Sequence, residues 1–520
     1  MSSNLLRRLS SSGVAGLTSR LAPACRACYS SVHTANQNYV NGEIVGTINS
    51  DRSQDFEVHN PATGELICKL ASAGPADVDG AVHAAKQAFK EWSSMTGMDR
   101  GKILREAARR IRSESDKLAH VEVMDTGKAL WEAEFDIAGC ADSIDYYGCL
   151  ATTVSGQFIP LANGSHGYTI REPLGVCGGI GAWNYPFQMA SWKSAPALAC
   201  GNTLVFKPSQ FTPLTAVMLA EIYTQSGVPN GVFNVIQGQG ETGQLLCKHA
   251  DIAKMSFTGS VETGSKVMAT CAEGIKKVTL ELGGKSPMIV FEDADLENAA
   301  KGAIMANFLT QGQVCSNGTR VFVHRSILEP FLEKVVARTK LMTHGDPLHK
   351  DTKVGAMIHE QQAQKVLDYI QSAVDEGAEI LYGGDRVDMG EKFAKGHFLR
   401  PCILVNCRDD MKAVREEIFG SVMTVLPFDA EDEVLQRANN TELGLAGGVF
   451  TNDLNRAHRV AAALQAGSLY VNNYNVYPPE MPFGGNKKSG IGREGGQVAL
   501  DYYTQVKSVY VESGDVWCPV

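Results

Sequence analysis

Cys315 is the side chain of this 520-residue sequence whose setting best suits nucleophilic chemistry. It follows Gln311-Gly312-Gln313-Val314, and a Gln-Gly-Gln turn is a flexible loop that can present sulfur to a cleft. A thiolate placed in this way can add to an electrophilic carbon and form a covalent intermediate. Most cysteines are instead small buried hydrophobic residues, and this chain contains 13 of them. The turn alone leaves both interpretations open.

A glycine-rich segment earlier in the chain has the pattern of a dinucleotide-binding turn. Gly238, Gly240 and Gly243 form GxGxxG, which follows a strand-like run and precedes a helix-like run. The fingerprint requires this context, because the turn brings phosphate groups to the N-terminus of a helix. The segment therefore favours a dinucleotide cofactor.

The elements around these residues alternate between strand and helix. After amphipathic helical spacing from Val78 to about Tyr147, five β-branched runs are separated by helix-length segments. The runs are 176–180, 203–206, 232–236, 254–257 and 278–282. Such alternation predicts a parallel sheet covered by helices on both faces.

A second alternation predicts a second α/β domain. It comprises a strand at 287–291, a helix at 294–309, a strand at 320–324 and a helical run from Leu328. The chain ends in a strand-like stretch, 501–512, with no helix of its own.

Composition limits the partners of the protein. The net charge is −9, and the lysines and arginines are scattered, which argues against nucleic acid or an anionic membrane surface. No apolar run approaches the roughly 20 residues needed to span a bilayer. The cysteines form no paired CxxC pattern with zinc-ligand spacing, so we expect no metal. A small-molecule substrate fits best.

The first 42 residues have the composition of a mitochondrial presequence. They contain no Asp, Glu or Lys, but four arginines, eight serines and leucines at helical spacing. We expect cleavage after about residue 31 and a place in the mitochondrial matrix. A disordered N-terminal extension on a cytoplasmic protein has the same composition and remains the alternative.

Six short stretches, in their order and spacing, resemble the aldehyde dehydrogenase superfamily. They are Trp183-Asn184-Tyr185-Pro186-Phe187, Phe206-Lys207-Pro208-Ser209, Leu280-Glu281-Leu282-Gly283-Gly284-Lys285, Gln311-Gly312-Gln313-Val314-Cys315, Glu416-Glu417-Ile418-Phe419-Gly420 and Pro482-Phe483-Gly484-Gly485. The resemblance covers nearly the whole chain after residue 38. Within the superfamily, the runs 181–188, 191–200 and 306–315 are most similar to those of enzymes for betaine aldehyde and 4-trimethylaminobutyraldehyde.

The resemblance implies the aldehyde dehydrogenase fold. This α/β fold has a Rossmann-like NAD-binding domain, expected at 32–153 and 172–284, and a second α/β catalytic domain at 285–490. A small β oligomerisation element is expected at 154–171 and 491–520. Its strands could add to the sheet of a neighbouring subunit, so we expect a homo-oligomer, either a dimer or a tetramer.

The resemblance also assigns catalytic roles. An aldehyde has no electron pair placed to expel hydride, so its oxidation needs a tetrahedral intermediate, which the Cys315 thiolate would supply. Glu281 matches the base that activates water for hydrolysis of the thioester. The Asn184 amide and the Cys315 N–H match the donors to the oxyanion. Family members that transfer the acyl group to coenzyme A generally lack the glutamate, so Glu281 favours an acid product.

For the cofactor, the resemblance points to NAD. It places the phosphates at Ser260 and Gly264 rather than at the GxGxxG glycines, and the two riboses near Lys207 and near Glu417 and Phe419. The further residues expected around the cofactor are Trp183, Ser209, Gln210, Gly240, Gly243 and Leu282. Many relatives have Glu at the position of Gln210, where the charge repels the 2′-phosphate of NADP. The neutral Gln210 therefore leaves some use of NADP open.

For the aldehyde, aromatic residues suggest a trimethylammonium group. This cation donates no hydrogen bond and is best held by aromatic faces, although aromatic residues line many aldehyde pockets. The expected pocket residues are Tyr185, Trp192, Tyr477, Glu480 and Phe483. Leu309 replaces a tryptophan of some plant relatives and Phe483 replaces another tryptophan, so we expect a looser pocket that accepts several aminoaldehydes. A broad-specificity aliphatic aldehyde dehydrogenase is the alternative function.

Overall fold

The computed structural model describes residues 38–520. The predicted presequence, 1–31, and residues 32–37 of the expected NAD-binding domain lie outside the described residues.

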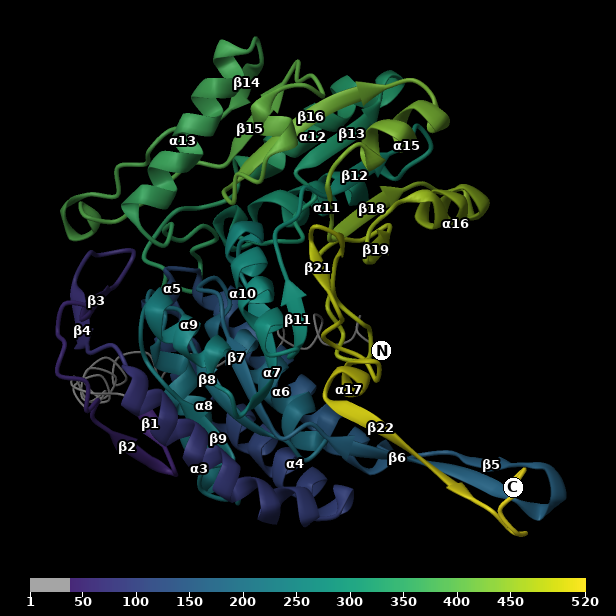
Figure 1. The fold of residues 1–520 in the computed structure, drawn as a ribbon. Helices are drawn as coiled ribbons and strands as arrows, with labels where there is room; N and C mark the ends of the chain where they lie inside the picture. Colours follow the sequence, from purple (N-terminus) through teal and green to yellow (C-terminus); the bar gives the residue numbers. More distant parts are fainter. Residues whose placement is uncertain (1–37) are drawn as a thin grey trace.

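An eight-stranded sheet forms the centre of the first α/β unit (Figure 1). Its strand order is β2-β1-β9-β8-β7-β10-β11-β21. The parallel strands are β7 (Val176–Ile180), β8 (Thr203–Lys207), β9 (Phe233–Val235), β10 (Ile252–Thr258) and β11 (Lys277–Glu281). The antiparallel edge strands are β1 (Asn38–Val40), β2 (Glu43–Val45) and β21 (Gly490–Ile491). The five β-branched runs are therefore confirmed as neighbouring parallel strands.

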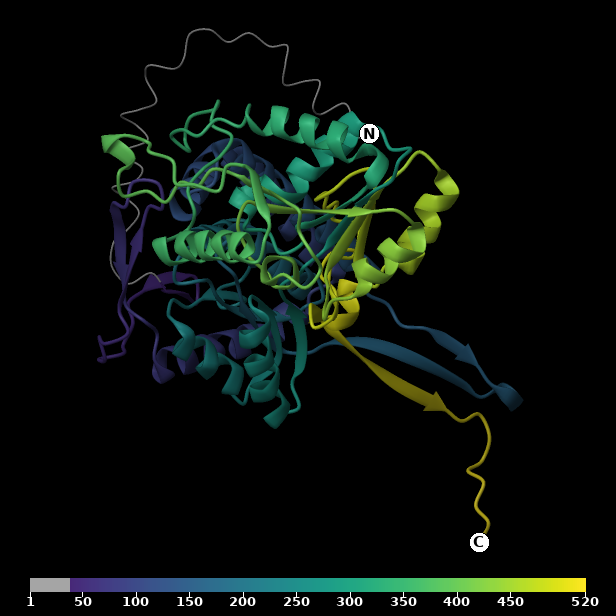
Figure 2. The same ribbon diagram turned by 90° about the horizontal axis from the view of Figure 1, so that it is seen from above.

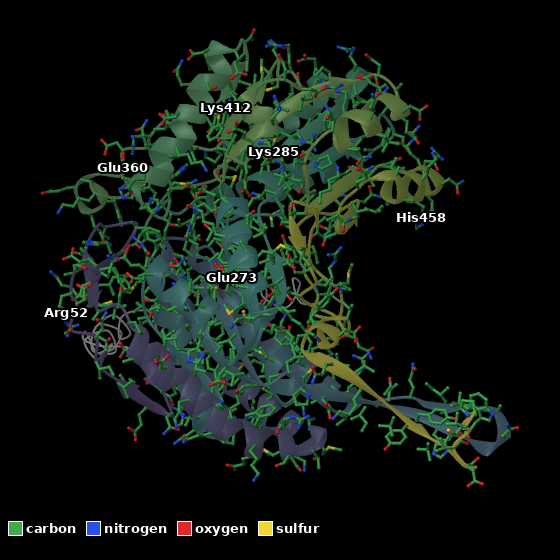
Figure 3. The ribbon with its side chains drawn as sticks, in the orientation of Figure 1. Arg52, Glu273, Lys285, Glu360, Lys412 and His458 are labelled. Carbon is green, nitrogen blue, oxygen red and sulfur yellow. The ribbon has the colours of Figure 1, made fainter. Side chains whose placement is uncertain are left out.

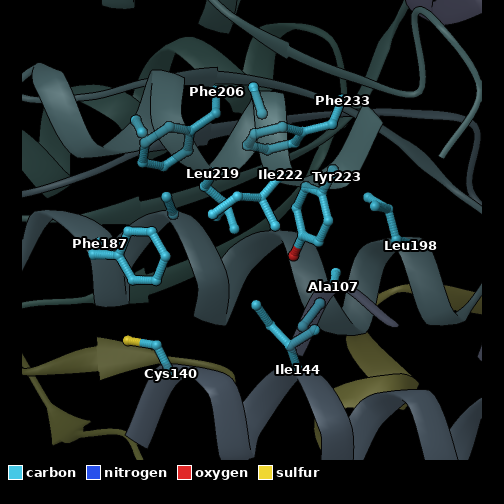
Figure 4. Packing of buried hydrophobic residues seen from close by; sticks show 14 of the residues in the cluster. Ala107, Cys140, Ile144, Phe187, Leu198, Phe206, Leu219, Ile222, Tyr223 and Phe233 are labelled. Atoms are coloured by element: carbon cyan, nitrogen blue, oxygen red, sulfur yellow. The ribbon is translucent and has the colours of Figure 1, made fainter. Parts of the chain in front are cut away.

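Helices cover this sheet on both faces, as its apolar strands require. They are α3 (Pro75–Ser94), α4 (Gly97–Ser113), α5 (Ser115–Thr126), α6 (Leu130–Leu150), α7 (Pro186–Ala199), α8 (Leu214–Gln225), α9 (Gly240–Lys248) and α10 (Val261–Glu273). The helical spacing from Val78 is confirmed, because Val78 and Val82 are buried on one face of α3. Figure 4 shows Phe206 and Phe233 of the sheet packed over Phe187, Leu219 and Tyr223 of the helices.

A seven-stranded sheet forms the second α/β unit, with the order β14-β15-β16-β13-β12-β18-β19. Its strands are β12 (Pro287–Val290), β13 (Arg320–His324), β14 (Glu379–Tyr382), β15 (Cys402–Val405), β16 (Val422–Phe428), β18 (Ala446–Phe450) and β19 (Ser468–Val471). Its helices are α11 (Leu296–Phe308), α12 (Leu328–Thr339), α13 (Glu360–Asp375), α14 (Lys412–Arg415), α15 (Glu431–Asn439) and α16 (Leu454–Ala463). The second alternation is thereby confirmed.

Three antiparallel strands form an arm that extends away from both units (Figures 1 and 2). They are β5 (Phe158–Pro160), β6 (His166–Pro173) and β22 (Thr504–Val511). The expectation of a strand over 501–512 without its own helix was wrong at its start, where α17 (Ala499–Tyr502) lies. This short helix forms because Ala499 and Leu500 are buried and anchor its turn.

Two small antiparallel pairs of strands complete the fold. They are β3 (Phe56–His59) with β4 (Leu66–Leu70), and β17 (Leu443–Gly444) with β20 (Asn486–Lys487).

Charged side chains are spread over the outside of the molecule. Arg52, Glu360, Lys412 and His458 are exposed, whereas Lys285 is buried (Figure 3). Among residues 38–520, no helix is long and apolar enough to cross a membrane. Within the same range, no group of three or more His, Cys, Asp or Glu residues is arranged to hold a metal ion.

Candidate active site

The loop that carries Cys315 connects α11 to β13 and has an unusual backbone. Thr310, Gln311 and Gly312 have φ values of +49°, +53° and +72°. Only glycine adopts this region freely, and Gly312 also lies against the backbone of Gly420, where a Cβ would collide. The loop thus turns sharply and leaves Cys315 half-buried.

The surroundings of Cys315 favour its neutral thiol over the thiolate. Burial raises its pKa to about 12, and the carboxylates of Glu417 and Glu281 act in the same direction. The N–H groups of Cys315 and Ser316 oppose this shift. A thiol needs a base or a change in its surroundings before it can act as a nucleophile here.

Glu281 ends β11 and is 3% exposed. Neither of its carboxylate oxygens has a hydrogen-bond partner within the described structure. Burial raises its pKa well above the ordinary value, Glu494 raises it further, and Lys193 and Arg493 oppose the shift. A buried carboxyl with free oxygens and a raised pKa has the properties of a general base.

Glycines let three catalytic segments meet closely. A Cβ on Gly284 would lie 2.5 Å from the Cys315 carbonyl oxygen, and a Cβ on Gly484 would lie 2.7 Å from Glu281 Oε1. Side chains at these positions would push the segments apart. The glycines of the Leu-Gly-Gly and Phe-Gly-Gly stretches therefore bring Glu281 and Cys315 into one site.

Asn184 faces the nucleophile loop. Its side chain is 4% exposed, and Nδ2 donates a hydrogen bond to the Gln313 carbonyl oxygen at 2.8 Å. An amide nitrogen carries two N–H groups, so the second is not used in this bond. The Cys315 N–H and the Asn184 amide thus belong to the same small region, as an oxyanion site requires.

Two buried charged residues behind Glu281 were missed in the sequence. Lys193 Nζ lies 2.6 Å from Glu494 Oε1 and 2.8 Å from Thr258 Oγ1. Glu494 also pairs by backbone hydrogen bonds with Phe483. The signal was Lys193 itself, because a lysine within the buried helix α7 requires a partner.

The expected cofactor residues lie at the carboxyl ends of the parallel strands, where this type of fold binds nucleotides. Lys207, at the end of β8, is buried and donates to the carbonyl oxygens of Pro208 and Gly238 at 2.6 and 2.9 Å. Burial lowers its pKa to about 8. An ammonium has three N–H groups, so Lys207 can also donate to a ribose hydroxyl. Gly243 lies against the Lys207 side chain, and Gly240 begins α9.

Ser260 is exposed and caps α10 by accepting a hydrogen bond from the Thr263 N–H. Gly264, one turn later, lies against Leu282, so the helix approaches the end of β11. An exposed helix N-terminus with a capping hydroxyl fits a phosphate. Ser209 and Gln210 follow Lys207 and are half-exposed.

The remaining residues expected at the cofactor lie next to the segments that carry Cys315 and Glu281. Trp183 and Phe419 contact edge to face, with ring centroids 5.2 Å apart. Glu417 accepts a hydrogen bond from the Gly284 N–H at 3.1 Å, and burial raises its pKa to about 7. The residues present therefore suit a dinucleotide that runs from Lys207 to the Cys315 loop.

Comparison with known proteins identifies the family. The sequence profile of the aldehyde dehydrogenase family matches residues 48–509. This chain belongs to the aldehyde dehydrogenase family.

Named relatives of this aldehyde dehydrogenase cover most of its length. It is 59% identical to 4-trimethylaminobutyraldehyde dehydrogenase A of Danio rerio, over 90% of this chain and 92% of that protein. It is 57% identical to 4-trimethylaminobutyraldehyde dehydrogenase of Homo sapiens, over 90% of this chain and 95% of that protein. Among solved structures, the NAD⁺ complex of betaine aldehyde dehydrogenase from Staphylococcus aureus has a TM-score of 0.91 and 36% identity. The match covers 95% of this chain and 99% of that chain.

This aldehyde dehydrogenase has an aromatic cavity of about 200 Å³, which reaches the Cys315 loop only through Tyr477. Trp192, Tyr477 and Phe483 line it, with ring centroids 5.5 to 6.5 Å apart. The Tyr477 hydroxyl lies 2.5 Å from Ser316 Oγ, directly after Cys315 in the chain. Tyr470 also lines the cavity, a residue that no sequence motif marked.

Two of the expected pocket residues, Tyr185 and Glu480, do not line this cavity. Tyr185 is buried at 7% exposure, and the Lys128 ammonium lies 4.1 Å from its ring centroid. Glu480 is exposed, while its neighbours Pro479 and Met481 line the cavity. The structure therefore brings together Trp192, Tyr477 and Phe483, with Tyr185 deeper and Glu480 further out.

Proposed function

We propose that this enzyme oxidises a trimethylammonium aldehyde, either 4-trimethylaminobutyraldehyde or betaine aldehyde, to the carboxylate with NAD. The observation that carries the proposal is the cluster of Trp192, Tyr477 and Phe483, linked through the Tyr477 hydroxyl to Ser316 beside Cys315. Aromatic faces attract a cation that cannot donate hydrogen bonds. The names of the relatives and the NAD⁺ complexes of the structural neighbours support the same substrate and cofactor.

In the proposed reaction, the Cys315 thiol gives its proton to solvent water, and the resulting thiolate adds to the aldehyde carbon and forms the oxyanion of a thiohemiacetal. The Asn184 amide and the Cys315 N–H stabilise the oxyanion. A bound NAD would supply the acceptor for the hydride of this intermediate. Glu281 then takes a proton from water, whose oxygen adds to the thioester carbon and releases the Cys315 thiolate and the carboxylic acid. Lys193 and Glu494 lie behind Glu281 and adjust its affinity for that proton.

A panel of steady-state rates tests the substrate. We expect higher kcat/KM for 4-trimethylaminobutyraldehyde or betaine aldehyde than for hexanal. Equal kcat/KM for all three aldehydes would support the broad aliphatic enzyme. The cavity also suits that enzyme, because no carboxylate is among its lining residues.

Replacement of Gln210 by glutamate is expected to strengthen the preference for NAD. The added charge would repel the 2′-phosphate of NADP and lower kcat/KM for NADP by about tenfold relative to NAD. Gln210→Leu removes the amide without adding charge, and we expect it to change the ratio less. The two cofactors are compared under identical conditions. A ratio that Gln210→Glu leaves unchanged would show that residue 210 lies away from the adenosine ribose.

The replacement Glu480→Gln is expected to raise KM for a trimethylammonium aldehyde about fivefold at low ionic strength, because the loop carboxylate attracts the cation as it enters. KM for hexanal should stay constant, and the difference should shrink as salt is added. Glu512→Gln, on the distant arm, serves as a control for a lost surface charge. If both aldehydes respond alike, Glu480 shapes the loop and does not recognise charge.

We propose that the enzyme assembles as a homo-oligomer, a dimer or tetramer, through the β5-β6-β22 arm. Its exposed apolar residues, among them Phe158, Val506 and Tyr510, support contact with another subunit. We also propose that residues 1–31 direct the chain to the mitochondrial matrix; these residues lie outside the described structure.

A further inference from the structure

A group of buried charged residues lies where α5 joins α6, and the proposed reaction uses none of them. Glu122, Asp125 and Lys128 are 0% exposed, Glu132 is 2% exposed and Asp136 is 8% exposed. The Lys128 ammonium lies 2.6 Å from Asp136 Oδ2 and 3.8 Å from Glu122 Oε1. One buried ammonium thus faces several carboxylates.

Such a group is a poor source of stability. Taking ions out of water is unfavourable, and apolar residues of similar volume often stabilise a fold equally well. These charges therefore matter more for the positions in which they hold neighbouring residues than for stability.

Two contacts from this group meet at Thr310, in the loop that leads to Cys315. Glu132 Oε1 accepts a hydrogen bond from the Thr310 N–H at 2.8 Å. Lys128 lies over the Tyr185 ring, and the Tyr185 hydroxyl lies 2.8 Å from Thr310 Oγ1. Both the backbone and the side chain of Thr310 are thereby held.

Thr310 has an unfavourable backbone conformation that neighbouring contacts must stabilise. It and Gln311 are non-glycine residues in the left-handed region, immediately after α11 ends. Such conformations persist only where surrounding contacts enforce them, and they often occur beside functional groups. Cys315 lies five residues further along the same loop, so a shift at Thr310 would move the sulfur.

We propose that Glu132 is a positioning residue that holds the nucleophile loop through Thr310, with Lys128 assisting through Tyr185. This inference deepens the role proposed for Cys315 and rests on it. Loss of the Glu132 contact should displace Cys315 from its reactive geometry and leave the cofactor residues on the other strands unaffected.

The test measures the rate at which iodoacetamide alkylates Cys315 in the full-length protein without cofactor, followed by mass spectrometry of the Cys315 peptide. We expect Glu132→Ala to slow alkylation and kcat by about 10- to 100-fold, with unchanged affinity for NAD, because small displacements of a reacting group have effects of this size. Glu132→Gln retains an acceptor oxygen and should stay close to the parent rate.

Asp125→Ala is the matched control. Asp125 is equally buried in the same group, but its carboxylate accepts from the Leu214 N–H at 3.0 Å rather than from the loop. We expect it to lower the melting temperature as Glu132→Ala does, while alkylation of Cys315 stays within about twofold of the parent. If Glu132→Ala does not fold, Tyr185→Phe removes only the hydroxyl contact with Thr310 and should slow alkylation several-fold.

An unchanged alkylation rate in folded Glu132→Ala, or in Tyr185→Phe where that variant replaces it, would overturn the proposal. The proposal would also be overturned if Asp125→Ala slowed alkylation of Cys315 as much as Glu132→Ala does. The same holds if Glu132→Gln were alkylated as slowly as Glu132→Ala. Alkylation requires neither aldehyde nor NAD, so an error in the proposed substrate leaves this test intact. Retained turnover in a Cys315→Ala variant would instead contradict the proposed role of Cys315, whereas the alkylation rates would still show whether Glu132 positions the loop.

Discussion

Replacement of Cys315 by alanine is expected to abolish aldehyde oxidation, with a fall in kcat on the order of 10⁴-fold or more. In the proposed mechanism the thiol forms the covalent intermediate, which alanine cannot form. The affinity for NAD should change little, because the proposed contacts of the cofactor come mainly from Lys207, the α10 N-terminus and Glu417. NADH formation and NAD binding are measured on the same preparation.

Cys149→Ala provides the matched control, since Cys149 is exposed on α6. It should retain the parent rate. Turnover by Cys315→Ala would refute the covalent mechanism, and loss of NAD binding would show that the cysteine also supports the cofactor site.

Replacement of Glu281 by glutamine is expected to lower steady-state turnover roughly 10²- to 10⁴-fold, the usual contribution of a general base. Hydride transfer precedes the step that Glu281 assists, so a rapid burst of NADH should appear or grow before the slow steady state. Stopped-flow measurement of NADH gives the amplitude of this burst.

The same variant predicts a change in the pH profile. Burial raises the pKa of Glu281, so its basic form is present at high pH and is lost as the pH falls through that raised value. The parent should lose deacylation on the acid side, and Glu281→Gln should lack that decline. The control is Glu416→Gln, because Glu416 is an exposed carboxylate that accepts a hydrogen bond from the Tyr369 hydroxyl. A uniform loss without a burst would argue against a role confined to deacylation.

The elements could be predicted from the sequence because their signals are local. The run Val176–Ile180 is buried on both sides of a sheet and reads as an unbroken apolar strand, and Val78 and Val82 recur at the helical period. Cys315, Glu281 and Asn184 could be selected because each lies in a short stretch of characteristic residues. The family resemblance linked these stretches before any contact between them was known.

Contacts between distant segments could not be predicted in the same way. Lys193 and Glu494 are 301 residues apart in the chain and become partners only because α7 and the segment after β21 pack together. Tyr470 enters the cavity at the end of β19, and its neighbours in the chain give no sign of this. The Lys128 ammonium lies over the ring of Tyr185, a contact that the residues next to Tyr185 in the chain do not indicate.

The two α/β units, the family and the candidates for the reacting side chains could thus be found from the amino-acid sequence, since these depend on residues that are neighbours in the chain. Only the tertiary structure decided what surrounds those side chains. The raised pKa of Glu281, the left-handed turn at Thr310 and the aromatic cavity arise from burial and from contacts between loops of different strands. Burial and such contacts are properties of packing, and a local pattern of residues does not contain them.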